Sequence, residues 1–224
     1  MKLNLRTSAL TALAVFAPIF ASAETLIRLD LPQDHSRLAV RAMKSELRRI
    51  VADADLDLLW QSSSERPSEV NGRTVSVALT GRCFGGPPAR YESGPLGWTK
   101  TINGRVLPFV EISCGRIASL LEPALRSEPQ AVRDLFFGKA LGRVLGHELA
   151  HALSRTHHHA SEGLCKAALS PRDLMQSHYQ LARADFAAAP LVRPNRAQQR
   201  QVAQNAPEPA ELPDPPTSGD GLGR

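Results

Sequence analysis

The chain has 224 residues, which is enough for one domain with a substantial buried core. Its 27 basic and 22 acidic residues give a formal net charge of +5, and the basic residues are scattered along the chain. A charge this small and this dispersed argues against nucleic-acid binding and is typical of a solvated surface.

The first 23 residues have the composition of a secretory signal peptide. Lys2 and Arg6 give a positive start, residues 9–20 form an apolar run, and residues 21–23 (ASA) are a small-residue cleavage site. The apolar run is too short to span a bilayer as a helix. We therefore expect cleavage after Ala23 and export to the periplasm or the medium, without a stable membrane anchor. The mature chain then holds 25 basic and 22 acidic residues, a net charge of +3.

The segments after the cleavage site predict a mixture of strands and helices. Residues 25–31 and 56–60 alternate between apolar and polar, which predicts a strand for each, and the polar residues 62–69 predict a loop. Between the two strands, apolar residues recur at three- and four-residue steps and predict an amphipathic helix that begins at Asp34 or Ser36. The apolar positions of this helix are Val40, Met43, Leu47, Ile50 and Ala54.

The middle of the chain has the strongest strand pattern. Residues 73–83 alternate, and residues 97–114 predict a hairpin whose tight turn is Asn103-Gly104. Pro108 cannot donate a hydrogen bond to a neighbouring strand, so we expect its strand to lie at or near the edge of the sheet.

The three cysteines, Cys83, Cys114 and Cys165, predict one disulfide and one free thiol, because export places them in an oxidising compartment. Three pairings are possible. Cys83 and Cys114 each end a predicted strand of the same sheet, and if those strands are neighbours, their side chains can meet at bridging distance. We therefore favour the pair Cys83–Cys114.

The second half of the chain predicts two helices and a tail. Residues 127–130 (SEPQ) resemble a capping box with an early proline and open a long helix that continues to Leu153. Residues 170–173 (SPRD) cap another helix. Residues 191–224 hold no aromatic residue, so we expect a disordered tail after a domain of residues 24–190. The residues expected on the second helix are Leu174, His178, Leu181 and Phe186.

The long helix carries the motif H-E-x-x-H near its end. His147 and His151 are four residues apart, so both imidazoles lie on one face of the helix and can share one ion. Neutral imidazole nitrogens are good zinc ligands. Glu148 is placed to take a proton from a zinc-bound water rather than to bind the metal. The motif therefore predicts a Zn²⁺ site with Glu148 as the catalytic base.

A catalytic zinc ion needs a third protein ligand and an open fourth position. The stretch resembles the metzincin pattern H-E-x-x-H-x-x-G-x-x-H, whose spacing makes His157 the third ligand. The glycine of that pattern falls on Ser154 here, and a non-glycine residue resists the left-handed turn that follows the helix. A wider loop to His159 needs no left-handed residue at that point, and Gly163 supplies the next flexible turn.

The stretch is more similar to a group of uncharacterised exported bacterial proteins with the motif H-E-L-x-H-x-L-x-x-T-x-x-H-x-x-x-G-[IL]-M. This chain departs from the motif at Cys165, where the group usually has methionine. The resemblance implies a small zincin fold, a metallopeptidase role and His159 as the third ligand, with His157 as the alternative. The matching residues are His147, Glu148, Leu149, His151, Leu153, Thr156, His159, Gly163 and Leu164.

Cys165 leaves other functions open. Its thiolate can fill the fourth position and make the protein a non-catalytic, zinc-stabilised binding module; it can also act as a redox latch or pack as a small apolar residue. Weaker candidates for the site are Tyr179 and His178, as groups that stabilise an oxyanion, and Tyr91. His35 fits a turn or a helix cap better than a site.

Together these patterns predict an α+β, zincin-like fold in which a small mixed sheet packs on two main helices. The strand near Pro108 is expected to form the edge above the zinc, and in the metzincins that the chain resembles, an extended peptide pairs with such an edge. The expected function is zinc-dependent hydrolysis of peptide bonds outside the cytoplasm. A zinc amidase that acts on a non-peptide amide, such as a cell-wall crosslink, fits the sequence as well.

Overall fold

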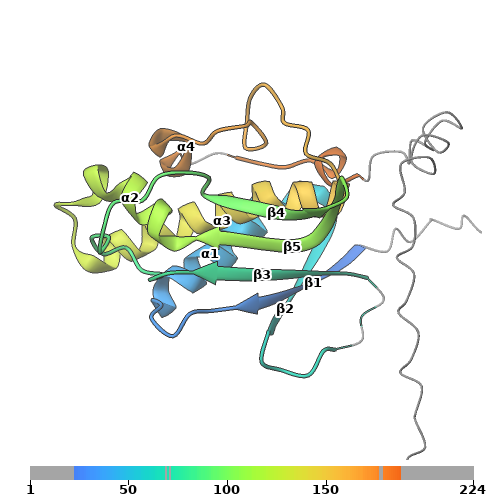
Figure 1. Cartoon of the computed structure of the whole chain (residues 1–224), viewed down its shortest axis with the longest axis horizontal. Coiled ribbons are helices and arrows are strands. Elements are labelled where there is room, and N and C mark those ends of the chain that lie inside the picture. Colours follow the sequence, from blue (N-terminus) through green and yellow to red (C-terminus); the bar gives the residue numbers. More distant parts are fainter. Residues whose placement is uncertain (1–22, 69, 71, 177–178, 188–224) are drawn as a thin grey trace, which may run out of the picture. The chain divides into compact units, whose positions relative to one another are not determined.

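The computed structural model describes residues 23–187, apart from residues 69, 71, 177 and 178 (Figure 1). The predicted signal peptide and the predicted tail therefore lie outside the described residues, except that Ala23 begins the first strand. Among the helices of the described part, none combines the length and the apolar character that a membrane crossing requires.

The described residues form a mixed α/β architecture on one five-stranded sheet (Figure 1). The strand order is β2-β1-β3-β5-β4, and all neighbours run parallel except β4 and β5, which form an antiparallel hairpin. Alternation in the sequence predicts the first three strands and the hairpin signal predicts the last two, and the mixed sheet is confirmed. The strands are β1 (Ala23–Asp30), β2 (Leu56–Ser62), β3 (Arg73–Thr80), β4 (Gly97–Ile102) and β5 (Arg105–Ser113).

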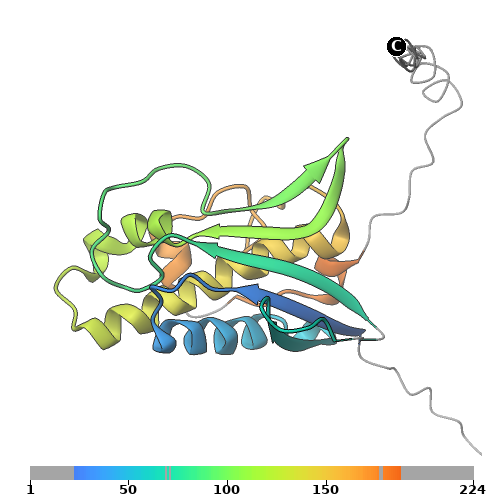
Figure 2. The same ribbon diagram turned by 60° about the horizontal axis from the view of Figure 1, so that its bottom comes forward.

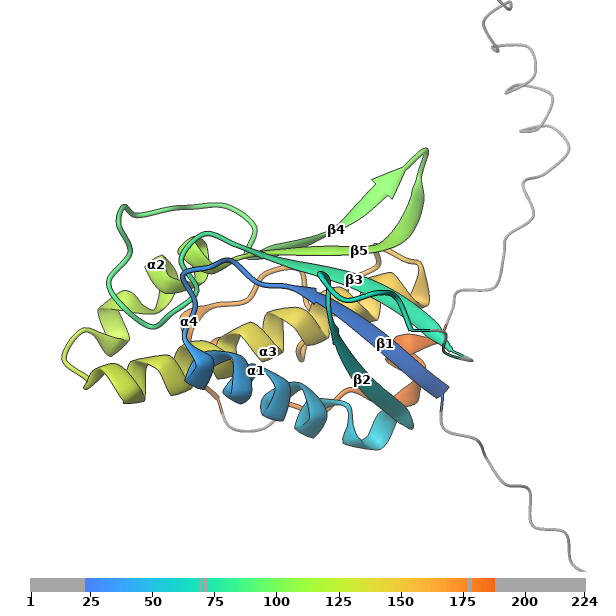
Figure 3. The ribbon, with the colours of Figure 1, turned by 90° about the horizontal axis from the view of Figure 1, so that it is seen from below.

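Two long helices, α1 (Arg37–Ile50) and α3 (Gln130–Ser154), lie side by side on one face of the sheet (Figures 2 and 3). Helix α1 begins at the predicted cap Ser36, whose hydroxyl accepts a hydrogen bond from the Ala39 main-chain nitrogen at 3.2 Å. A short 3-10 turn, η1 (Ala52–Ala54), follows α1. The helices and the sheet share one core, in which the fully buried side chains include Ile27, Met43, Leu47, Ile50, Val75, Ile112, Leu141 and Leu145.

Glycine residues let α3 approach α1 very closely. A Cβ atom at Gly138 would lie 2.3 Å from the main-chain oxygen of Ala39, and one at Gly142 would lie 2.8 Å from the main-chain oxygen of Met43. Real Cβ atoms essentially never lie within 3.0 Å of such atoms, so neither position has room for another residue. The H-E-x-x-H motif begins little more than one turn after Gly142. The close contact of the two glycines with α1 therefore helps to fix the position of the motif.

The region between the hairpin and α3 differs from the sequence prediction. Helix α2 (Cys114–Leu125) was not foreseen, because its cap Ser113 lies within the strand pattern and Pro123 lies inside the helix. The predicted capping box at residues 127–130 is wrong: Pro129 is the N-cap of α3, and no side chain caps the helix. Ser127 is unsuited to capping, because it lies in the turn that ends α2.

Helix α4 (Pro171–Met175) begins as predicted but is much shorter. The capping box within residues 170–173 is confirmed. Arg143 donates to the main-chain oxygen of Leu174 at 2.6 Å, so a tertiary contact occupies the carbonyl that a further helical turn would use. Of the other residues expected on this helix, Leu181 lies beyond it, Phe186 lies in the 3-10 turn η2 (Arg183–Phe186), and His178 is outside the described residues.

The hairpin of β4 and β5 confirms the predicted turn, in which Asn103 and Gly104 have φ angles of 49° and 73°. The strand of Pro108, β5, lies near the edge of the sheet, as predicted, but does not form it, because β5 pairs with both β3 and β4, and β4 is the edge strand. The proline is tolerated because pairing with β3 begins only at Phe109 and the register with β4 is irregular over the same stretch.

The predicted disulfide Cys83–Cys114 is present, with Cα atoms 5.0 Å apart. Its cysteines follow β3 and β5, which are neighbours in the sheet as the prediction requires. A disulfide that closes a loop of 31 residues stabilises a fold by roughly 3–4 kcal/mol. The bond ties the start of α2 to the sheet, and Cys165 is free.

Candidate metal centre

Helix α3 places His147, Glu148 and His151 in its last two turns, where the helix is buried. The exposed fractions of these residues are 8%, 5% and 6%. Buried polar groups normally have hydrogen-bond partners or bind a ligand. Each of the three side chains therefore needs a partner that explains its burial.

The chain turns sharply after α3 and returns to the helix. Arg155 ends the helix with a φ of 57°, and Gly163 has a φ of 76°, as expected of a flexible turn. Ser154 itself is not left-handed, as expected, but a non-glycine residue, Arg155, adopts that conformation one position later. The left-handed backbone costs about 1 kcal/mol, which contacts of the returning loop offset.

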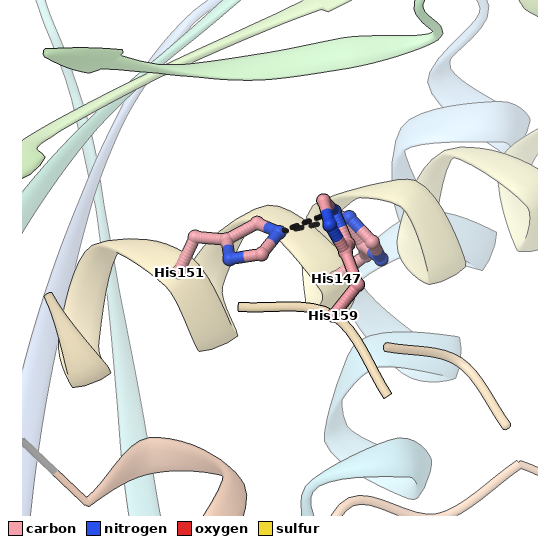
Figure 4. A group of neighbouring side chains, drawn as sticks. All are labelled: His147, His151 and His159. Carbon is pink, nitrogen blue, oxygen red and sulfur yellow. Dashed lines mark hydrogen bonds between the residues drawn. The ribbon is translucent and has the colours of Figure 1, made fainter. Parts of the chain in front are cut away.

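The returning loop brings His159 against the two helix histidines (Figure 4). Nε2 of His151 lies 3.0 Å from Nε2 of His147 and 3.2 Å from Nε2 of His159. The rings of His147 and His159 stack with their centroids 5.3 Å apart. One nitrogen from each of the three residues lies within 4.8 Å of the others. We call these three residues the histidine cluster; His157 does not belong to it.

Main-chain oxygens fix the position of the proton on two of the imidazoles. His147 Nδ1 lies 2.8 Å from the Leu164 oxygen, and His151 Nδ1 lies 2.8 Å from the Thr156 oxygen. A carbonyl oxygen only accepts, so both Nδ1 atoms carry the proton. Burial lowers the pKa of His147, and it lowers the pKa of His151 to about 4, so both rings are neutral. The Nε2 atoms of His147 and His151 therefore carry no proton, and their lone pairs lie close to each other.

This arrangement favours a bound cation. Two lone pairs at 3.0 Å repel each other unless a proton or a metal ion lies between them. A tetrahedral zinc ion with Zn–N distances of about 2.0–2.1 Å separates its nitrogen ligands by roughly 3.3 Å, which is close to the two Nε2 distances in the cluster. Neutral imidazoles whose other nitrogen is hydrogen-bonded are the usual zinc donors. The donor set of the histidine cluster therefore fits a metal ion.

Glu148 lies outside the histidine cluster and contacts the edge strand. The Thr99 hydroxyl donates to Glu148 Oε2 at 2.8 Å. Burial raises the pKa of Glu148 to about 7, although the hydrogen bond from Thr99 opposes the rise. A carboxyl group that titrates near neutral pH is suited to exchange protons, and a cation in the cluster would lower its pKa again.

The start of β4 lies directly on this part of α3. A Cβ atom at Gly97 would lie 3.0 Å from Glu148 Cγ, so a larger residue would push the strand away from the helix. The Ser113 nitrogen donates to the Leu96 oxygen at 2.9 Å. Because hydrogen bonds alternate along an antiparallel pair, the main-chain groups of Gly97 and Thr99 face away from β5 and lie on the free edge.

A cleft of about 970 Å³ runs along the histidine cluster. Its walls are α3 on one side, β4 with residues 91–96 on another, and residues 166–169 of the returning loop on a third; α2 closes one end. Both helix histidines, Glu148, His159 and Thr99 line this cleft. A cleft of this size can take several residues of an extended chain.

His157 and Cys165 flank the histidine cluster without joining it. His157 Nε2 lies 2.7 Å from the Thr101 hydroxyl, and its ring centroid lies 6.2 Å from that of His151. Cys165 packs half-buried against the core, and burial raises the pKa of its thiol to about 11. Over the described ranges, Cys165 is not among the residues whose ligand atoms come together, so it does not close the site.

The weaker sequence candidates lie away from the cluster or outside the described residues. The Tyr179 hydroxyl donates to Asp173 at 3.0 Å, and Tyr179 is not among the residues that line the cleft. Tyr91 lines the cleft but is 66% exposed and has its hydroxyl bonded elsewhere. His35 bonds a main-chain oxygen three residues earlier, as predicted for a turn residue. His178 is outside the described residues.

Sequence reasoning missed the groups that orient the site. These are the hydroxyl of Thr99 and the main-chain oxygens of Thr156 and Leu164. Main-chain oxygens leave no signal in residue identity. The sequence does contain one indication that Thr99 belongs to the site, because Thr99 lies in the hairpin that is expected above the zinc.

No protein-family model and no curated protein matches this chain. A functional assignment therefore rests on the residues of the chain itself.

Proposed function

We propose that the protein is a zinc-dependent peptidase with a zincin-like fold that acts outside the cytoplasm. His147, His151 and His159 would hold the zinc ion, and Glu148 would serve as the general base. The observation that carries the proposal is the meeting of three imidazole nitrogens within 4.8 Å of one another, beside a buried glutamate whose pKa is raised.

Three features of the architecture support the zincin-like assignment. The H-E-x-x-H motif lies near the end of a buried helix, α3, as the motif requires. The edge strand β4 lies directly above the glutamate of the motif. After α3, the chain reverses and returns a third histidine, His159, to the helix.

The free edge of β4 supports a peptide as the substrate. The main-chain N–H and C=O groups of Gly97 and Thr99 point away from β5 along the wall of the cleft. An extended peptide can add to such an edge as a further strand, through hydrogen bonds that do not depend on its sequence. The side chain of Thr99 then holds Glu148 beside the main chain of the bound peptide.

Zinc, when bound, would supply a Lewis acid that activates water and polarises the substrate carbonyl. The chain itself supplies the proton transfer. The Thr99 hydroxyl occupies Glu148 Oε2, so Oε1 is free to take the proton of the attacking water and to pass it to the leaving nitrogen. The oxygens of Thr156 and Leu164 hold the two helix imidazoles in one tautomer and one orientation.

The disulfide supports an oxidising compartment. Disulfides persist in exported proteins and are rare in the reducing cytosol, and Cys83 is bonded to Cys114. Together with the signal-peptide composition, the bond favours action in the periplasm or the medium.

The test compares zinc-loaded wild-type protein with Glu148→Gln on a degenerate peptide mixture, with products identified by mass spectrometry. Glutamine cannot take the proton, so we expect hydrolysis to fall by roughly 10²–10⁴-fold while the bound zinc, measured by elemental analysis, stays equimolar. Glu162→Gln removes an exposed acid from the returning loop and should leave hydrolysis unchanged. Wild-type turnover in Glu148→Gln, or no hydrolysis by zinc-loaded wild type, would refute the proposal.

A further inference from the structure

Arg116 brings an unpaired positive charge into the cleft. It lies in the first turn of α2 and lines the cleft with residues 94–96. Its Nη1 donates to the Pro95 oxygen at 2.8 Å, and its Cζ lies 5.7 Å from the centre of the Trp98 ring. Its Nε is buried without a partner. Within the described part of the chain, no carboxylate oxygen lies within 4.0 Å of its guanidinium.

The other charged groups of the cleft have contacts of their own. Lys166 pairs with Asp173 at 2.7 Å. The carboxylate of Glu92 lies against Gly115, the residue before Arg116, but not within 4.0 Å of the Arg116 guanidinium. Glu148 accepts from the edge strand. A guanidinium that is partly removed from water and lacks a counter-ion is costly, unless a ligand supplies the negative charge.

The main chain connects Arg116 to the proposed reaction centre. The guanidinium holds Pro95, and Gly97, two residues later, contacts Glu148. Two residues of extended chain span at most about 7 Å, so Pro95 lies within about two residues of an extended substrate from Gly97. A peptide that pairs antiparallel with β4 runs from Ile102 toward Gly97, so the residues after its scissile bond approach Arg116.

We infer that Arg116 binds a carboxylate on the C-terminal side of the scissile bond. The carboxylate can belong to an acidic side chain or to the free C-terminus of the substrate, and a guanidinium fork suits both because it forms paired hydrogen bonds with either. The inference rests on the proposed peptidase function for its meaning, but the carboxylate site rests on the surroundings of Arg116 alone. The expected substrates are therefore peptides with acidic side chains, or peptides that are cleaved close to their free C-terminus.

The test measures binding rather than turnover, with the zinc-loaded full chain carrying Glu148→Gln. The probes are four acetylated hexapeptides of one sequence, with Glu or Gln at the fourth position and a free or amidated C-terminus, titrated by calorimetry. We expect the preferred carboxylate to lower Kd by roughly 10–100-fold relative to its amide. The side-chain pair and the terminal pair distinguish the two sources.

Three further variants in the same background assign the preference. Arg116→Met keeps the aliphatic stem and should abolish the preference, and Arg116→Lys should retain part of it. Arg105→Met removes an equal charge from the exposed hairpin turn and should retain all of it. Equal binding of the four peptides, or a preference that survives Arg116→Met, would overturn the inference.

Failure of the carboxylate site and failure of the peptidase proposal give different results. If the preference depends on Arg116 but zinc-loaded wild type hydrolyses no peptide, the carboxylate site stands and the peptidase proposal falls. If the wild type hydrolyses peptides without regard to carboxylates, the role of Arg116 falls and the peptidase proposal stands.

Discussion

Two polar clusters include buried side chains that lie one turn apart on α3, Arg143 in one and His147 in the other, and their hydrogen bonding differs completely. His159, which the returning loop adds to the second cluster, is exposed. Arg143 Nε donates to Glu46 at 2.7 Å, and its Nη1 donates to the Leu174 oxygen at 2.6 Å. Arg49 adds a second cation to Glu46, also at 2.7 Å. In this arginine–glutamate cluster, donors face acceptors. In the histidine cluster, four residues further along α3, acceptors face acceptors.

The same contrast appears in the two buried glutamates. Burial alone would raise the pKa of Glu46, but hydrogen bonds from Arg49 and Arg143 outweigh it and lower the pKa. Burial raises the pKa of Glu148 to about 7, because a single hydroxyl is too weak to oppose it. Burial of a charged residue therefore does not distinguish a structural site from a functional one. The distinguishing property is whether the buried carboxylate has cationic hydrogen-bond donors that offset its burial.

The largest expected effect is on stability, at the arginine–glutamate cluster. Arg143→Met leaves Glu46 buried with only Arg49 beside it and should lower the free energy of unfolding by about 3–5 kcal/mol, measured by urea denaturation. Its zinc affinity should stay within about threefold of wild type. The double variant Arg143→Met with Glu46→Leu should recover most of the loss, and no recovery would mean that packing, not charge, holds this cluster.

The next largest expected effect is on zinc affinity, and it differs among the three consecutive histidines. His159→Ala should weaken zinc binding by at least roughly a hundredfold, about 2.7 kcal/mol, because it removes one of three donors. His157→Ala and His158→Ala should change it by less than about threefold, since neither belongs to the cluster. Calorimetric titration of each variant makes the comparison. A damaging His157→Ala with a silent His159→Ala would restore the usual metzincin spacing.

Removal of zinc should destabilise the wild-type protein by about 2.7 kcal/mol relative to protein with free zinc at 100 times its Kd. In the proposed site, the lone pairs of the cluster would then lose the ion that separates them. Thermal unfolding with and without a chelator measures the difference. Zinc should stabilise Arg143→Met by the same free energy as it stabilises wild type. In His159→Ala, most of this stabilisation by zinc should be lost. Equal losses in both variants would mean that the two clusters are coupled.

The smallest expected effect is on the pH dependence of stability. The folded-state pKa of Glu46 lies below its ordinary value of 4.5, so its contribution is fully present above that value and is lost as pH falls through the folded pKa. The free energy of unfolding should therefore fall more steeply below pH 4.5 in wild type than in Glu46→Gln. Parallel curves for the two proteins would show that Glu46 does not contribute.

The elements that the sequence predicts best are those whose signal is local. Alternation predicts β3, the Asn103-Gly104 pair predicts its turn, and Ser154, together with the resemblance to the exported proteins, predicts that His159 rather than His157 approaches the helix. Each depends on residues within one strand, one turn or one loop. The cysteine pairing needed one further step, the adjacency of two strands.

The predictions that fail depend on distant partners. The helix α4 ends where Arg143, a residue on another helix, donates to the Leu174 oxygen. The strand β5 lies beside the edge rather than at it, because it pairs with β3 as well as with β4. Ser127 fails as a cap because an unforeseen helix ends there. Arg155 adopts a left-handed conformation that its own side chain disfavours, because the loop contacts beyond it require the reversal.

The close contact of α1 with α3 at Gly138 and Gly142 determines where mutations outside the cleft can inactivate the protein. A single methyl group at either position would act as a spacer between the helices and would tilt the segment that begins at His147. Inactivating mutations should therefore arise on the side of α3 that faces α1, where no side chain reaches the cleft. Such alleles would mimic substitutions in the histidine cluster, although every proposed zinc ligand and Glu148 keep their identity.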